Sequence, residues 1–108
     1  MVEWLEPWWS TEDQSDHFRE TFLRQLRLEL SPAHALFGLP ARVIGRGDGD
    51  DALFEILDGT GRVAVVHLVW SKAQQEPPWP GTSIYPSLQA FVDVRMRPEH
   101  LEWVASQE

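Results

Sequence analysis

Residues 52–70 read ALFEILDGTGRVAVVHLVW, two apolar segments joined by the turn sequence DGTG at residues 58–61. Glycine adopts positive φ angles without steric cost, so this turn between two apolar segments predicts a tight hairpin with a bulge. We expect its two strands at about residues 52–57 and 62–70. The hairpin decides the fold, because the rest of the chain has to cover it.

The second strand of this hairpin is apolar on both faces. Side chains alternate between the faces of a strand, and His67 is the single polar side chain in residues 63–70. A strand that is apolar on both faces is typical of a central strand with cover above and below. We therefore expect this strand inside the sheet, with His67 as a neutral, buried or half-buried side chain of that cover. Its nearest polar companion would be Glu55 on the neighbouring strand.

Two helices and one more strand complete the predicted fold. Apolar side chains recur at helical spacing in residues 10–31, and Ser10 or Thr11 is the expected N-terminal cap of this helix. Pro32 follows directly and is expected to end the helix. A second helix is expected from Ser87 to Pro98, and a strand at about residues 41–46 joins the hairpin. The pattern predicts an α+β domain in the order helix, three-stranded antiparallel sheet, helix, with both helices on one face of the sheet.

Tryptophan is unusually frequent, with six residues in a chain of 108. Large rings can lie over an apolar sheet as cover, or they can form a surface on which a partner docks. The sequence leaves both roles open. The candidate binding residues are Trp8, Trp9, His67, Trp70, Trp79 and Tyr85.

The length fits a single domain over residues 1–108, with a Trp-rich arm at 1–10 and a tail at 99–108. Seventeen acidic and nine basic residues give a formal net charge of −8, which repels the phosphates of nucleic acids. No apolar segment approaches the roughly 20 residues that span a membrane, and the first residues are acidic, unlike a secretory signal. We therefore expect a cytoplasmic protein without nucleic-acid or membrane partners.

Little in the sequence indicates chemistry. The absence of cysteine excludes disulfides, thiolate zinc sites and a cysteine nucleophile. The sequence GRGDGDD at residues 45–51 carries carboxylates, but their spacing is not that of an EF-hand, and we expect a solvated turn. The four histidines lack zinc-binding spacings. No catalytic residue, metal or cofactor is predicted.

Three segments carry a resemblance to other sequences: WLEPWW at residues 4–9, DALFEILDGTGRVAVVHLVW at 51–70 and PWPGTSIYPSLQAFV at 78–92. In these segments the chain resembles a group of short, uncharacterised bacterial proteins with a Trp-rich N-terminus, and the match covers most of its length. The resemblance implies a compact cytosolic bacterial domain that stands alone. It implies no activity, cofactor or catalytic residue.

Three hypotheses of function follow. The first is a non-enzymatic interaction module whose aromatic surface binds an unknown protein partner or a second copy of the chain. The second is an immunity-like inhibitor that masks a basic partner through its acidic charge. The third is a small-molecule-binding protein or enzyme with His67 in an aromatic pocket, which a closed pocket holding His67 beside Glu55 would favour.

Overall fold

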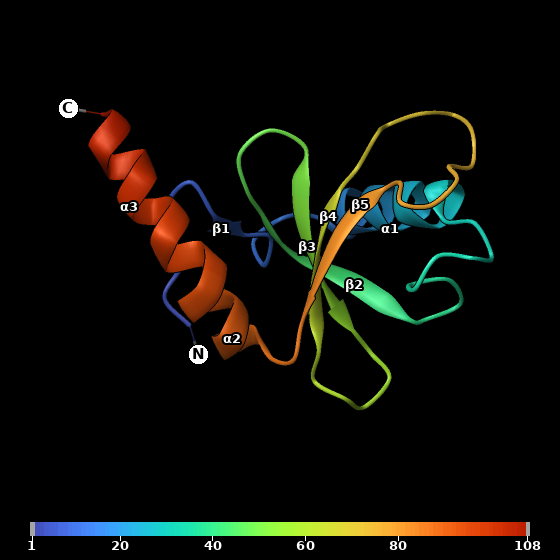
Figure 1. Cartoon of the computed structure of the whole chain (residues 1–108), viewed down its shortest axis with the longest axis horizontal. Helices are drawn as coiled ribbons and strands as arrows, with labels where there is room; N and C mark the ends of the chain where they lie inside the picture. Colours follow the sequence, from blue (N-terminus) through green and yellow to red (C-terminus); the bar gives the residue numbers. More distant parts are fainter. Residues whose placement is uncertain (1, 108) are drawn as a thin grey trace.

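The computed structural model describes residues 2–107 and has an α+β fold, with a five-stranded antiparallel sheet between helices (Figure 1). The strands follow one another in the sheet in chain order, β1-β2-β3-β4-β5. The elements are β1 (Trp9–Ser10), α1 (Asp16–Glu29), β2 (Ala41–Arg46), β3 (Asp51–Ile56), β4 (Val63–His67), β5 (Gly81–Tyr85), α2 (Leu88–Phe91), the π-helical turn η1 (Val92–Met96) and α3 (Arg97–Ser106). None of the helices in residues 2–107 has the length and apolar character needed to span a bilayer.

The sheet has five strands rather than the predicted three, because two strands lie in segments whose sequence indicates loops. Prolines at positions 80 and 86 flank β5, but they leave five residues between them to pair with β4. The β-branched side chains of Thr82 and Ile84 suit a strand. β1 has only two residues, Trp9–Ser10, which is too short for a periodic pattern.

The hairpin predicted from the DGTG turn is confirmed. β3 and β4 pair in antiparallel register with Asp51 opposite His67, and the turn glycines Gly59 and Gly61 have φ angles of 85° and 77°. The second strand is shorter than predicted and ends at His67. Beyond that point the backbone leaves the sheet, and Trp70 has a left-handed φ of 60°.

The predicted central position of β4 is also confirmed. The strand lies between β3 and β5, and Val65 and Leu68 are 3% and 0% exposed. The prediction that His67 is part of the apolar cover is wrong, because its side chain is 58% exposed. His67 is the last residue of β4, one position beyond the strand's run of buried side chains. Its partner is Asp51, whereas Glu55 lies opposite Val63 at the other end of the hairpin.

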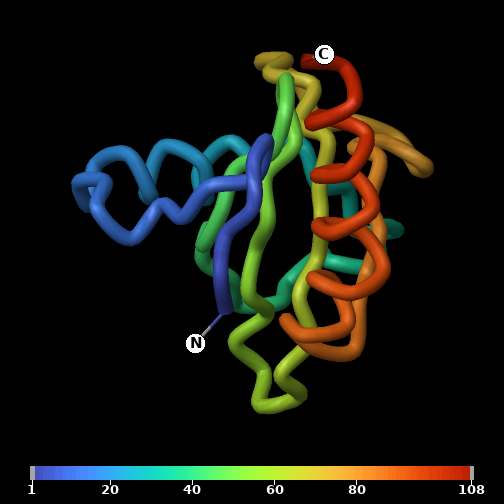
Figure 2. The backbone as a smooth tube through the Cα atoms, turned by 90° about the vertical axis from the view of Figure 1, so that its left-hand side faces the viewer, coloured from blue at the N-terminus to red at the C-terminus, as the bar shows by residue number. Residues whose placement is uncertain are grey.

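The prediction that both helices lie on one face of the sheet is wrong: they lie on opposite faces (Figure 2). Neighbouring residues of β3 show the reason, because Phe54 packs in the core beside α1 while Leu53 packs in the core beside the C-terminal helix. A sheet whose central strands are apolar on both faces needs cover on both. The core on the α1 face includes Phe22, Leu26, Leu30, Val43, Phe54, Val66 and Leu68. The core on the other face is formed by Trp8, Leu53, Val63, Val65, Phe91, Val92 and Met96.

The C-terminal helix begins as predicted after Ser87, whose side chain caps it, but Pro98 does not end it. A proline inside a helix lacks an N–H group, and its ring clashes with the carbonyl four residues earlier. Here a π-helical turn precedes Pro98, in which the N–H of Arg97 bonds to the carbonyl of Val92 five residues back. The wider turn accommodates the proline, so the helix continues to residue 106 through the region predicted as a tail.

The first helix begins later than predicted. Its N-cap is Ser15, whose hydroxyl accepts a hydrogen bond from the N–H of Phe18 at 3.1 Å. Ser10 pairs with β2 as part of β1 instead, and the buried hydroxyl of Thr11 donates to the carbonyl of Val43. The N-terminal arm is therefore attached to the sheet.

Candidate functional site

The six candidate binding residues do not form a single surface. Trp8 is 1% exposed, and its ring packs edge-on against Phe91 with centroids 4.9 Å apart. Tyr85 packs against the same Phe91 at 5.8 Å. Both rings therefore cover the face of the sheet beside the C-terminal helix. Of the two roles open to the tryptophans, Trp8 serves as cover and not as a docking surface.

Trp9 and Trp70 lie instead at the two ends of a row of four rings along α1. Trp9 is 6.2 Å from Phe18, Phe18 is 4.9 Å from Phe22, and Phe22 is 5.2 Å from Trp70, measured between ring centroids. Each of the two tryptophans is 40% exposed, whereas Phe22 is buried. We call these four residues the aromatic surface. Phe22 also belongs to the core of the α1 face and Phe18 packs against that core, and their i, i+4 spacing places both rings on one face of the helix.

A cation lies against the middle of the aromatic surface. The guanidinium of Arg46 stands 4.6 Å from the ring centroid of Phe22 and donates to the carbonyls of Gly49 and Asp51 at 2.8 and 3.2 Å. Burial lowers the pKa of Arg46, and the nearby Asp50 and Asp51 act in the opposite direction. These contacts fix the loop between β2 and β3 beside the rings.

The backbone around Trp70 is held by a buried carboxylate. Glu29, at the end of α1, is 0% exposed, and its oxygens accept hydrogen bonds from the N–H groups of Val69 at 2.8 Å and Trp70 at 2.9 Å. The side chain of Gln25 donates to Glu29 at 2.6 Å and to the carbonyl of Ser71 at 2.9 Å. Two helical side chains thus fix the segment that follows β4.

These hydrogen bonds offset an unfavourable backbone conformation. A bulky residue at positive φ is a clear outlier, and such a residue costs about 1–3 kcal/mol. Trp70 is the one non-glycine residue with a positive φ in the described chain, yet the residue is 40% exposed to solvent. Strain of this kind occurs mainly at sites where it has a function.

His67 belongs to a polar network on the face of the sheet that carries the C-terminal helix, opposite α1. Its Nδ1 lies 2.9 Å from Asp51, and Arg95 contacts both Asp51 and Glu99, at 3.4 and 3.0 Å. Glu99 in turn accepts the indole N–H of Trp8 at 2.7 Å. The network fixes the C-terminal helix to the sheet.

The charge of Arg95 is secured within this network. Burial disfavours the charged guanidinium, but the hydroxyl of Tyr85 and the carboxylates of Glu99 and Asp51 outweigh that effect and raise the pKa of Arg95. The arginine therefore stays protonated and keeps both ion pairs.

Trp79 lies outside the aromatic surface. It is 54% exposed, and its ring is near the backbone of Gly81 at the start of β5. No ring of the described residues stacks on it. Trp79 is therefore an exposed tryptophan that is separate from Trp9 and Trp70.

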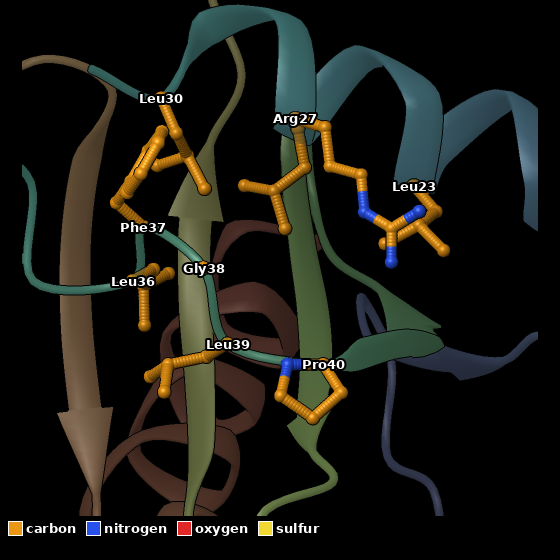
Figure 3. A pocket seen from close by; sticks show the side chains of 9 residues that line it. Leu23, Arg27, Leu30, Leu36, Phe37, Gly38, Leu39 and Pro40 are labelled. Atoms are coloured by element: carbon orange, nitrogen blue, oxygen red, sulfur yellow. The ribbon is translucent and has the colours of Figure 1, made fainter. Parts of the chain in front are cut away.

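Sequence reasoning missed two open grooves that lie among residues 2–107. One, of about 400 Å³, lies between α1 and residues 36–40 and is lined mainly by leucines (Figure 3). The other, of about 540 Å³, lies between the N-terminal segment and β2 and is lined by both apolar and polar side chains, the Arg42–Glu55 ion pair among them. His67 lines neither groove. Each groove is assembled from segments far apart in the sequence, so no local pattern indicates it.

Within residues 2–107, no three His, Asp or Glu side chains are grouped so that they could hold a metal ion. The resemblance to short bacterial proteins stays a prediction. No protein-family model, curated protein or solved structure matches the chain.

Proposed function

We propose that this protein is a non-enzymatic binding module that docks a protein partner through the aromatic surface. One observation carries the proposal: Trp70 is held at a positive φ by the buried Glu29 while the residue stays 40% exposed. The strained backbone fixes an exposed tryptophan in the free protein, and a partner that covers the ring would gain the free energy of burying its apolar surface.

The other rings support the same role. Tryptophan offers a large contact area with only two side-chain torsions to immobilise, and it is enriched at the centres of protein interfaces. Trp9 and Trp70 are supported from below by Phe18 and Phe22, so their rings are ordered before any partner binds. A pre-ordered surface loses less entropy on binding.

A second candidate function, inhibition of a basic protein, is favoured by charge. The chain carries a net charge of −8. Asp48 and Asp50 are exposed in the loop that Arg46 fixes beside the aromatic surface. Carboxylates at the rim of an apolar contact steer a basic partner and make its association rate depend on salt. Measuring that association rate at low and high salt distinguishes an inhibitor of this kind from a neutral docking module.

The test is the capture of partners from the native host by tagged protein. The test variant is the double substitution Trp9→Ala and Trp70→Ala, and the matched control is Trp79→Ala, which removes an exposed tryptophan elsewhere. Trp8 is unsuitable for the test because it is buried. Circular dichroism and thermal unfolding establish that each variant is folded.

We expect the wild type and Trp79→Ala to retain the same partner, and the folded double variant to lose it. Equal recovery by all three proteins would contradict the proposal. Loss of the partner in Trp79→Ala alone would place the docking surface at β5 and would also contradict it.

A further inference from the structure

The groove between α1 and residues 36–40 has the form of a small ligand site. Its floor consists of the core side chains Leu26, Leu30 and Leu36, which are at most 4% exposed, and Phe37 stands at its wall, 49% exposed. Its volume of about 400 Å³ lies in the range of small-molecule clefts. An apolar chain bound there would extend the core of the α1 face.

One charged side chain lines this otherwise apolar groove. Figure 3 shows the guanidinium of Arg27 beside Leu23, on the side of α1 that faces residues 36–40. Within residues 2–107, Arg27 makes no ion pair and donates no side-chain hydrogen bond. The chain has 17 acidic residues against nine basic ones, so an unpaired arginine at an apolar groove leaves a position for an external anion.

We propose that this groove binds a single-chain amphiphile with a carboxylate head, as in a free medium-chain fatty acid. The alkyl chain lies over Leu26, Leu30 and Leu36, and the carboxylate pairs with Arg27. The planar guanidinium matches the two oxygens of a carboxylate. The proposal is independent of the aromatic surface, because neither Trp9 nor Trp70 lines the groove.

The test follows backbone amide resonances by NMR while decanoate is added, and decanol serves as the uncharged control ligand. Arg27→Gln removes the cation. Arg24→Gln is the matched control, because Arg24 is an exposed arginine on the same helix that does not line the groove. Phe37→Ala removes an exposed wall and leaves the buried floor in place.

We expect decanoate to shift the resonances of residues 36–39 in a saturable manner. Arg27→Gln should weaken the binding of decanoate about threefold to fivefold, as expected for the loss of a partly exposed ion pair, and should leave the binding of decanol unchanged. Arg24→Gln should leave both affinities unchanged, and Phe37→Ala should weaken both ligands.

Three results would overturn the proposal. One is the absence of saturable shifts at residues 36–39 with decanoate. Another is an equal loss of decanoate affinity in Arg24→Gln and Arg27→Gln, which would show that decanoate responds to the overall charge of the helix and not to Arg27. The third is binding of a leucine-rich acidic peptide without binding of decanoate, which would assign the groove to a protein segment.

Discussion

The carboxylate of Glu29 holds the backbone of Trp70, whose N–H donates to it at 2.9 Å across 41 positions of sequence. The same carboxylate accepts the N–H of Val69 at 2.8 Å. The end of α1 therefore determines the direction in which the chain leaves β4, and with it the position of the Trp70 ring over Phe22. The aromatic surface depends on this buried contact.

Replacing Glu29 should destabilise the protein. Glu29→Ala leaves two N–H groups without their acceptor and should lower the free energy of unfolding by about 2–3 kcal/mol. Glu29→Gln has one carbonyl oxygen in place of two carboxylate oxygens, so its free energy of unfolding should lie between those of Glu29→Ala and the wild type. Urea unfolding measures both. The control is Glu20→Ala on the exposed side of the same helix, and an equal loss in that variant would contradict the role of Glu29.

Because of the strain at Trp70, glycine should be more stabilising than alanine at this position, the reverse of their usual order. Trp70→Gly should be more stable than Trp70→Ala by about 1 kcal/mol, because only glycine adopts a positive φ without steric cost. The same pair at Trp79, whose φ is not positive, should show no advantage for glycine. Thermal unfolding of the four variants measures the order. A Trp70→Ala variant as stable as Trp70→Gly would show that the backbone there is unstrained.

Close packing makes Gly47 sensitive to a methyl group. A Cβ atom added to Gly47 would lie 2.8 Å from Cζ2 of the buried Trp8 ring. Gly47→Ala should therefore destabilise the fold by about 1–3 kcal/mol. At Gly81 the nearest atom to an added Cβ is 3.9 Å away, so Gly81→Ala should change the stability by less than about 0.5 kcal/mol. Equal melting temperatures for the two variants would contradict this packing.

Asp58 makes the DGTG turn sensitive to acid. The hydroxyl of Thr60, then its N–H and Arg62, hold the pKa of the Asp58 carboxyl at about 2, below its ordinary value of 3.8. Because the folded-state pKa is lower, the stabilisation is complete above about pH 4 and is lost as the pH falls through about 2. The stability difference between wild type and Asp58→Asn should shrink over this window in urea unfolding. A difference that is independent of pH would show that the ionised carboxyl does not stabilise the turn.

The central part of the fold could be predicted because its signals are local. The DGTG turn and the alternation of β4 determine a buried hairpin from adjacent residues alone. The same alternation requires cover on both faces, and this requirement argues against placing both helices on one side. The helix cap at Ser87 is likewise a signal within a few residues.

The rest depends on contacts between distant segments. β5 pairs only because β4 lies beside it, and Pro98 is tolerated only because a π-helical turn precedes it. His67 is exposed because β4 ends there, although its neighbours are buried. In the sequence, Glu29 is an ordinary charged residue near a helix end. The residues around it do not indicate its hydrogen bonds to residues 69 and 70.

The most direct test of the proposed function is the dissociation constant of the captured partner for wild type and Trp70→Ala, measured by calorimetry on folded protein. Hot-spot residues of interfaces contribute at least about 2 kcal/mol and are enriched in tryptophan, so we predict that Trp70→Ala weakens binding at least about thirtyfold, while Trp79→Ala leaves it unchanged. An affinity for Trp70→Ala within about twofold of the wild type would contradict the docking role of the aromatic surface.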